Sequence, residues 1–503
     1  MNQKRYLALG LALLLSAAAL SGCGGQEEQP MQVAGSDAQE EQPALPLASS
    51  TEKADYITNI PSHVDAVAAA MAVALAEEAY ERMVAGDLVG AYAMWDERLQ
   101  AAVDQASFEE GWQTLLESTG AFKRIESMDV SEEQGFMTVL SVVECERARL
   151  QMLTATQKGG ELFLGFQFTP MEDYETIELP LPAGVKEKDI TVGEGSSHAL
   201  SGKLTLPESA TAEQPVPGVI LVHGSGPCDM DEAAHAYLPF RDIAYGLAEK
   251  GIAVLRYHKR SKLYPSSDYS TVNTETIEDA VLAAELLRQQ QGVDPQRIYI
   301  IGHSMGGMLA PRIDLAGGNF AGMIILSGTP YSMGEVALHQ AKASIEAQKD
   351  LMSAETYQTS MQSYEEQAAL MDSLTAETPE EEARALTIFG FNGYYLQDFA
   401  AHDHLTALTQ LQKPTLIMQG EADTQVTMAT DFAAYEKALK GQSWATLKSY
   451  PGLNHFYAPG SGDYLKTAEE YAQSALFDSA AIADMAQFIV SNEAGGSRLA
   501  PNS

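Results

Sequence analysis

The stretch Ile298-Tyr299-Ile300-Ile301-Gly302-His303-Ser304-Met305-Gly306 decides the fold of the second half of this chain. Its first four residues are apolar and predict a strand that is buried on both faces. The last five have the pattern Gly-x-Ser-x-Gly, which is typical of a sharp turn from a strand into a helix. Side chains at Gly302 or Gly306 would collide with neighbouring backbone in such a turn. The stretch therefore predicts that Ser304 projects from the end of a buried strand.

The sequence around this turn alternates between strand and helix patterns. Further short runs that predict strands are 219–222, 252–255, 323–326, 416–418 and 447–450. Segments with apolar residues at helical spacing lie between them, for example 277–287. This alternation predicts an α/β fold, with a doubly wound, mostly parallel sheet covered by helices. The segment at about 331–404 is helical in pattern, and we expect it to form a cap insertion.

Two residues downstream of the turn can activate Ser304. A serine hydroxyl is a poor nucleophile unless a base takes its proton, and the acid and the histidine follow this kind of serine in that order. Asp423 lies in the loop after the expected strand 416–418, at the edge where such sheets gather functional groups. Glu421 is the rival acid in that loop. His455 lies in a turn after the last strand, so we expect Ser304, Asp423 and His455 to form a catalytic triad.

An oxyanion hole is the third requirement of this chemistry. One donor is expected to be the backbone N–H of Met305, the residue after the nucleophile. The other is expected from the loop His223-Gly224-Ser225-Gly226-Pro227, which follows the strand 219–222. Ser225 is the preferred donor in this loop and Gly226 is the alternative. We interpret His223 as a residue that braces the loop.

Together these residues resemble the α/β-hydrolase superfamily, and in particular bacterial serine esterases with an His-Gly-Ser-Gly-Pro loop and a Gly-Glu-x-Asp acid loop. The resemblance covers roughly residues 174–492. It implies hydrolysis of small carboxylic esters with short or medium acyl chains, through an acyl-enzyme on Ser304 and without a metal or cofactor. The chain departs from the relatives at 228–231 and 256–260. Both departures are expected near the mouth of the cleft and put the substrate preference in question.

Two other functions stay open at this point. A peptidase or an acyl-thioesterase can use the same fold and the same triad, because function is grafted onto a shared scaffold. A surface protein that binds a ligand or partner without catalysis belongs to a different class. The intact serine, aspartate, histidine and glycine loops favour an enzyme.

The first residues of the chain have the pattern of a targeting segment. Lys4 and Arg5 precede an apolar run, 6–20, that is short for a membrane span and typical of a signal peptide. The run ends in Leu20-Ser21-Gly22-Cys23, which resembles the bacterial lipobox. The resemblance implies that residues 1–22 are a lipoprotein signal peptide. It also implies that a lipid on Cys23 anchors the protein to the extracytoplasmic face of the cell membrane. An ordinary signal peptide with an incidental cysteine is the alternative.

Between the anchor and the hydrolase we expect a tether and a small domain. Residues 23–60 are rich in polar residues, glycine and proline, and predict a disordered tether. Residues 61–170 have helical patterns followed by strand patterns, which predicts a small α+β domain with Trp95 and Trp112 in its core. It is similar to a domain of unknown function that precedes hydrolases in some Gram-positive lipoproteins. The hydrolase domain is expected at 171–493, followed by a flexible tail at 494–503.

Composition excludes several other classes. A formal net charge of −38 argues against nucleic-acid binding, because phosphates would be repelled. The three cysteines form no Cys-x-x-Cys pair, so no zinc site is indicated. Cys145 and Cys228 fall in different expected domains, and buried free thiols are favoured over a disulfide between them. No pattern indicates an oligomeric state.

Overall fold

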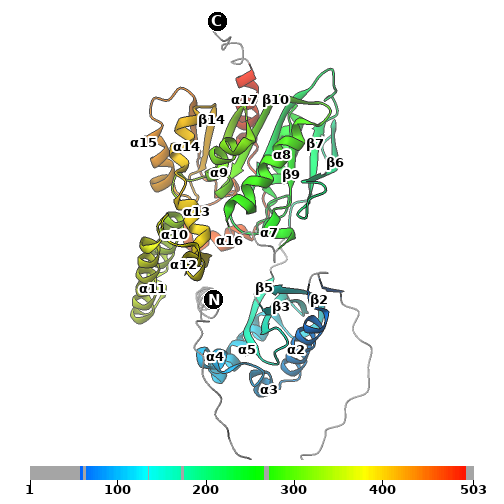
Figure 1. Ribbon diagram of the computed structural model, residues 1–503, viewed down its shortest axis with the longest axis vertical. Helices are drawn as coiled ribbons and strands as arrows, with labels where there is room; N and C mark the ends of the chain where they lie inside the picture. The colour runs from blue at the N-terminus through cyan, green and yellow to red at the C-terminus, as the bar shows by residue number, and fades with distance from the viewer. Residues whose placement is uncertain (1–56, 61–63, 134, 172–174, 265–270, 494–503) are drawn as a thin grey trace, which may run out of the picture. The chain divides into compact units, whose positions relative to one another are not determined.

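The computed structural model describes residues 57–60, 64–133, 135–171, 175–264 and 271–493 (Figure 1). The chain divides into two compact units, Met1–Asp173 and Tyr174–Ser503, whereas the sequence places the boundary between residues 170 and 171. The expected signal peptide, most of the tether and the tail lie outside the described residues. Within those described residues, no helix is both long enough and apolar enough to cross a membrane.

The first unit is an α+β domain, as the sequence predicts. Its elements are α2 (Ala66–Val84), α3 (Leu88–Tyr92), α4 (Glu97–Ala102), α5 (Gln105–Thr119), β1 (Ile57–Asn59), β2 (Phe122–Glu133), β3 (Phe136–Cys145), β4 (Arg149–Gln157) and β5 (Phe163–Met171). The sheet has the order β1-β2-β3-β4-β5, and β2 to β5 are antiparallel. Each helix begins after an aspartate whose side chain accepts N–H groups of the first turn, which satisfies donors that lack a helical partner.

Two strands of this unit have weak signals in the sequence. Residues 57–59, which the sequence assigns to the tether, form β1 and pair in parallel with β2. Only three residues take part, so no run of apolar residues reveals the strand. β2 itself carries charged residues such as Lys123 and Arg124 on its exposed positions, which hides its apolar face in the sequence.

Aromatic side chains form much of the core of the first unit. Trp95 and Trp112 are only 5% and 4% exposed, which confirms their predicted place in the core. Trp95 packs on Phe108 and Phe166, and fully buried Phe163 packs on Phe166. Cys145 is also buried in this core, whereas Cys228 is half-buried in the second unit, and both thiols are free.

The second unit is built on an eight-stranded sheet with the order β15-β14-β11-β10-β8-β9-β7-β6. The strands are β6 (Val185–Val192), β7 (Leu200–Pro207), β8 (Val216–Val222), β9 (Ala253–Tyr257), β10 (Val293–His303), β11 (Gly322–Leu326), β14 (Thr415–Gly420) and β15 (Ala445–Tyr450). The six strands from β15 to β9 are parallel. β7 and β6 add an antiparallel hairpin at one edge, which is not among the strands predicted from the sequence.

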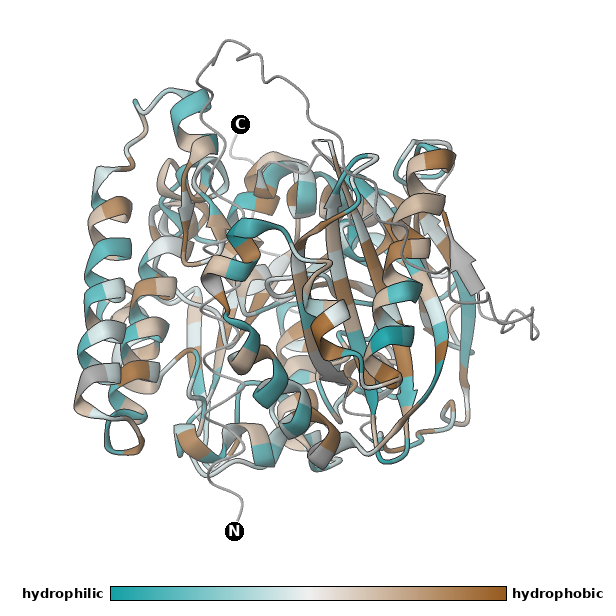
Figure 2. Ribbon diagram, turned by 90° about the horizontal axis from the view of Figure 1, so that it is seen from below, coloured by the Kyte–Doolittle hydropathy of each residue, from teal (hydrophilic) through white to brown (hydrophobic). Residues whose placement is uncertain are grey.

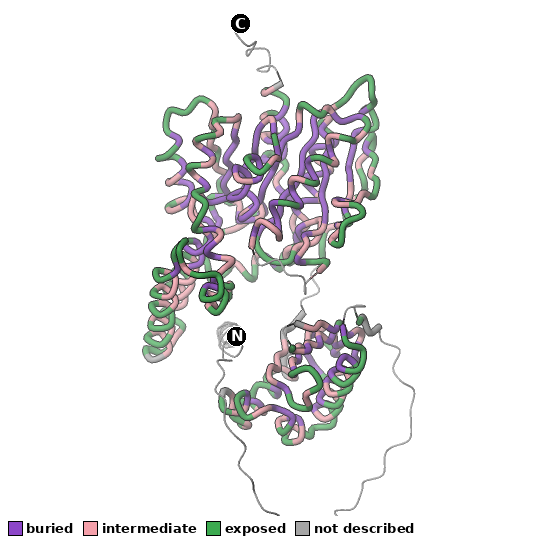
Figure 3. The backbone as a smooth tube through the Cα atoms, in the orientation of Figure 1, coloured by how far each residue is buried: buried purple, intermediate pink, exposed green. Residues whose placement is uncertain are grey.

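Helices cover both faces of this sheet. Along β10, Ile298 and Ile300 pack with α8 (Glu278–Arg288) and α9 (Met305–Ile313). The alternate residues Tyr299 and Ile301 pack with α6 (Pro239–Glu249) and α17 (Ser479–Glu493). The strands are consequently buried on both sides, and they form the purple centre of this unit in Figure 3. The predicted α/β class with a doubly wound, mostly parallel sheet is confirmed.

The insertion between β11 and β14 is mostly helical. It contains α10 (Met333–Ala347), α11 (Ala354–Ser373), α12 (Glu380–Ala385), α13 (Gly393–Ala400), α14 (His404–Leu411) and a small hairpin of β12 (Thr387–Ile388) and β13 (Phe391–Asn392). The described residues of α11 include no buried one, and polar and apolar residues alternate along the two long helices at the left of Figure 2. α13 differs, because it buries Leu396 and Phe399 against the main core. It therefore attaches the cap to the sheet.

Phe163→Ala should destabilise the first unit by about 3–5 kcal/mol, because it leaves a cavity among packed aromatic rings. Urea unfolding of the whole chain, followed by tryptophan fluorescence, measures this change. Two of the three tryptophans, Trp95 and Trp112, lie in this unit and report on it. Val89→Ala is the control, since Val89 is 61% exposed and its truncation should leave the transition in place. Equal midpoints for both variants would contradict the assigned core.

Candidate active site

The turn at Ser304 has an unusual backbone conformation, which depends on glycines at neighbouring positions. Ser304 has φ 52° and ψ −117°, a region that residues with a side chain rarely adopt. A Cβ on Gly302 would lie 2.2 Å from the carbonyl oxygen of Gly306, and a Cβ on Gly306 would lie 2.2 Å from that of Val222. The Ser304 amide donates to the Leu326 carbonyl at 2.8 Å. These contacts fix Ser304 between the end of β10 and the first turn of α9.

The structure brings Asp423 and His455 together. Nδ1 of His455 lies 2.7 Å from Oδ2 of Asp423, and both side chains are buried. Burial favours the neutral acid, but the interaction with His455 and the hydrogen bonds from the amides of Val426 and Gln425 outweigh it and lower the pKa of Asp423. An ionised carboxylate only accepts hydrogen bonds, so Nδ1 carries the proton and Nε2 is the basic nitrogen.

Glu421, the rival acid, has a different environment. It is exposed, and its carboxylate accepts a hydrogen bond from the Ser449 hydroxyl at 2.7 Å. Its backbone amide donates to the Tyr450 carbonyl, which continues the pairing of β14 with β15. The geometry therefore favours Asp423 over Glu421 as the partner of His455.

The glycine-rich loop after β8 lies against Ser304. A Cβ on Gly224 would be 3.3 Å from the Cβ of Ser304. Ser225 is exposed at the tip of this loop, and Gly226 adopts a positive φ of 80° that glycine tolerates. Met305, the other expected oxyanion donor, is buried at the first position of α9. Both expected donors thus belong to segments that border the nucleophile.

His223 supports the start of this loop. Its Nε2–H donates to the Asp229 carbonyl at 2.9 Å, and its ring packs on Phe240 and Tyr257. Burial lowers the pKa of His223 to about 4, so the ring is neutral at physiological pH. These contacts fit the bracing role predicted for it.

Sequence reasoning missed a buried ion pair beneath the site. Oε2 of Glu232 lies 3.1 Å from Nδ1 of His303, and each residue is only 4% exposed. Burial opposes both charges, but each partner stabilises the other. The pKa of Glu232 is lowered, and that of His303 is raised. Both shifts favour the charged pair, in which both ring nitrogens of His303 carry N–H donors.

This pair connects the three segments of the site. Glu232 Oε1 accepts the amide of Gly224 at 2.6 Å, and Nε2 of His303 donates to the carbonyl of His455 at 2.9 Å. The rings of His303 and His455 have centroids 4.7 Å apart. His303 occupies a variable position of the Gly-x-Ser-x-Gly pattern, and Glu232 follows the departure at 228–231. Neither position therefore belongs to a sequence pattern that indicates a functional residue.

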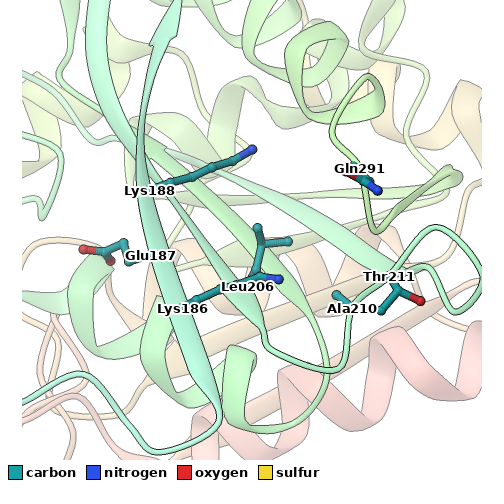
Figure 4. A pocket seen from close by; sticks show the side chains of 7 residues that line it. All are labelled: Lys186, Glu187, Lys188, Leu206, Ala210, Thr211 and Gln291. Atoms are coloured by element: carbon teal, nitrogen blue, oxygen red, sulfur yellow. The ribbon is translucent and has the colours of Figure 1, made fainter.

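A shallow pocket in the second unit lies away from these residues (Figure 4). Its lining consists of Lys186, Glu187, Lys188, Leu206, Ala210, Thr211 and Gln291. Ala210 and Gln291 precede β8 and β10, so the pocket is at the amino ends of the parallel strands. Ser304 follows the carboxyl end of β10. Because open α/β sheets bind ligands at the carboxyl ends of their strands, this pocket is not the catalytic cleft.

Comparisons with known proteins agree with this architecture. Residues 219–468 match the family described as the alpha/beta hydrolase family, and residues 76–156 match the family described as "Protein of unknown function (DUF3887)". The chain is similar to the esterase EstD of Thermotoga maritima. The two are 29% identical over 418 residues, which cover 82% of this chain and 93% of that protein. The predicted resemblance of the second unit, with a small additional domain before it, is confirmed.

Solved structures are similar at a lower level. Est1E from Butyrivibrio proteoclasticus is 17% identical, with 61% of this chain and 99% of that chain covered and a TM-score of 0.37. A hyperthermophilic esterase of the archaeon Pyrobaculum calidifontis is also 17% identical, with 61% and 85% covered and a TM-score of 0.37. Such TM-scores add nothing to the assignment, which rests on the family match and the strand order.

Glu232→Gln should lower the free energy of unfolding by about 2 kcal/mol, because it removes a hydrogen-bonded charge beside His303. Folding lowers the pKa of Glu232 from 4.5 and raises that of His303 from 6.5. The pair therefore makes its full contribution to the free energy of unfolding between pH 4.5 and pH 6.5. Its contribution falls as pH drops through the lowered pKa of Glu232 or rises through the raised pKa of His303.

Urea unfolding of the wild type and Glu232→Gln as a function of pH measures this effect. The difference between the two proteins should be greatest inside the window and should shrink on both sides of it. A difference that is constant with pH would show that Glu232 acts through packing alone.

Proposed function

This chain is an α/β-hydrolase, and we propose that it is a serine esterase that cleaves carboxylic esters of short or medium acyl chains. The observation that carries the proposal is the buried Asp423–His455 hydrogen bond of 2.7 Å, whose histidine accepts, at its backbone carbonyl, a hydrogen bond from His303, the residue before the strained Ser304. The similarity to an esterase over most of the chain supports the same reaction class. The acidic surface implied by the net charge of −38 suits a neutral or cationic substrate better than an anionic one.

The proposed reaction passes through an acyl-enzyme. His455 takes the Ser304 proton on Nε2 while the serine oxygen attacks the ester carbonyl, and Asp423 stabilises the imidazolium. The N–H groups of Met305 and Ser225 stabilise the oxyanion. His455 then gives its proton to the leaving alcohol. A water molecule, deprotonated by His455, attacks the acyl-enzyme, releases the carboxylic acid and restores the serine.

The cap supplies a candidate wall for the acyl chain. Tyr395 of α13 stacks with Phe391 at 6.2 Å between ring centroids and packs on Phe399 at 5.3 Å. Its hydroxyl lies 3.6 Å from the sulfur of Met305, next to the nucleophile. An apolar surface at this position favours an acyl group over a charged one. This contact supports the preference for acyl esters.

Ser304→Ala should abolish ester hydrolysis and leave the thermal unfolding temperature nearly unchanged, because only one polar atom is removed. Turnover of p-nitrophenyl acetate and octanoate measures the loss, and labelling by a fluorophosphonate should disappear in parallel. Wild-type turnover in Ser304→Ala would overturn the nucleophile.

The same assay separates the other candidate functions. A faster reaction with acyl-CoA or with aminoacyl anilides would indicate a thioesterase or a peptidase. A wild type that is inert to every substrate and to the label would indicate a non-catalytic binding protein.

We further propose that the mature protein begins at Cys23 and is held by lipid at the extracytoplasmic face of the membrane. The support is the lipobox-like sequence Leu20-Ser21-Gly22-Cys23 and the positive flank before the apolar run. Two or more acyl chains on one residue give stable anchoring, whereas a single chain binds membranes only marginally.

Cys23→Ala should shift the protein from the membrane fraction to the soluble fraction or leave its precursor unprocessed. Fractionation followed by mass spectrometry of the N-terminal peptide distinguishes these outcomes. Ser21→Thr is a matched control that keeps the cysteine. An unmodified Cys23 in the mature wild type would contradict the lipid anchor.

A further inference from the structure

A buried lysine lies behind the glycine-rich loop. Lys259 follows β9 and is only 2% exposed. Its ammonium group donates to the carbonyl of Gly224 at 3.0 Å and to that of Gly226 at 2.9 Å. In the sequence this lysine belongs to the departure at 256–260, which is expected near the mouth of the cleft. In the structure its charge is instead covered by the loop.

These contacts determine where the loop's N–H groups point. The carbonyl of Gly224 and the amide of Ser225 belong to one planar trans peptide unit, so they point in opposite directions. Lys259 binds the carbonyl and thereby turns the Ser225 N–H away from itself. The preceding peptide is also fixed, because the Gly224 N–H donates to Glu232. Ser225 is consequently the oriented donor of the loop.

The charge of Lys259 is balanced by a second buried group. Oε1 of Glu275 lies 3.2 Å from Nζ, and Glu275 is 5% exposed. Glu275 belongs to the π-helical turn η1 (Asn273–Ile277), a conformation that is frequent at functional sites. The three donors of the ammonium group thus have three acceptors: two loop carbonyls and one carboxylate.

The other oxygen of Glu275 leads into the cap. The hydroxyl of Tyr395 donates to Glu275 Oε2 at 2.7 Å and also lies 3.6 Å from the Met305 sulfur. One cap residue is therefore connected to both expected sides of the oxyanion hole. It touches Met305 directly and reaches Ser225 through Glu275 and Lys259.

From this geometry we infer that Lys259 is a positioning residue that aims the Ser225 N–H into the oxyanion hole. We further infer that Tyr395 couples the seating of the cap to this alignment through Glu275. The inference rests on the proposed function, since an oxyanion hole has a role only if Ser304 attacks an acyl group. It adds the requirement that the cap contributes to the chemical step as well as to substrate binding.

Tyr395→Phe tests the coupling with the loss of one oxygen atom. We expect kcat to fall about ten-fold for acetyl and octanoyl esters alike, with KM within about two-fold. This is less than the loss caused by removing an oxyanion donor, because the donor is loosened and not deleted. Tyr394→Phe is the matched control. It lies on the same helix with its ring 4.3 Å from the Arg384 guanidinium, and it should leave kcat unchanged.

Inhibitor binding separates positioning from packing. A trifluoromethyl ketone forms a hemiketal oxyanion on Ser304, so its affinity should fall in Tyr395→Phe by the same factor as kcat. The corresponding trifluoromethyl alcohol has no carbonyl for Ser304 to attack and forms no oxyanion, so it should bind as in the wild type. Lys259→Met should lower kcat and the affinity for the ketone together, and by a larger factor than Tyr395→Phe. Thermal unfolding establishes that each variant is folded.

The outcomes distinguish this inference from the proposed function. An active wild type with Tyr395→Phe equal to Tyr394→Phe overturns the coupling and leaves the esterase proposal standing. A change of KM or of chain-length preference at constant kcat also overturns it, because the cap would then only bind the acyl chain. A wild type that neither hydrolyses esters nor reacts with a fluorophosphonate overturns both.

Discussion

The close approach of three backbone segments around Ser304 is the constraint on which the second unit depends. The turn after β10 is so tight that a Cβ at Gly306 would come within 2.2 Å of the Val222 carbonyl at the end of β8. The nucleophile can take its strained conformation only where neighbouring parallel strands hold that backbone in place. The apolar strands and their helices on both faces provide this support, and they bring the loops after β8 and β14 to the same edge.

Charged side chains then determine the geometry within this edge. Glu232 holds the Gly224 amide and His303, and Lys259 holds the carbonyls of the same loop. Each charge is buried, and each has a partner of opposite sign. The Asp423 carboxylate is also buried, and it accepts a hydrogen bond from His455. The Glu232–His303 and Lys259–Glu275 pairs are therefore connected through the backbone of one loop, and His303 connects them to the backbone of His455.

The sequence predicts those parts of the molecule that follow from local patterns. Continuous apolar runs reveal β8, β10 and β11, because a strand covered on both faces needs no polar residue. The hairpin of β6 and β7 lies at an edge, where polar residues interrupt the pattern. The order of Ser304, Asp423 and His455 along the chain also follows from a local rule.

The partners of Glu232 and Lys259 could not be found in this way, because they are distant in the sequence. Glu275 precedes α8, Tyr395 lies in the cap, and only the folded sheet brings them to the loop. Arg256 illustrates the same difficulty: it is 2% exposed and bridges Glu187 of β6 to Asp231. The sequence shows a basic run at 256–260 near an expected cleft mouth, whereas the structure buries two of its cations.

Stability alone does not account for these buried ions. Removing a charge from water costs several kcal/mol, and well-packed apolar residues of similar volume often stabilise a fold at least as well as a buried ion pair. An apolar side chain in place of Lys259, however, has no means of turning a peptide plane. The ammonium group does so because it binds a carbonyl whose amide partner must point the opposite way. Burying Lys259 and Glu275 thus costs free energy but sets the direction of the Ser225 N–H group. That direction matters most where negative charge develops during catalysis.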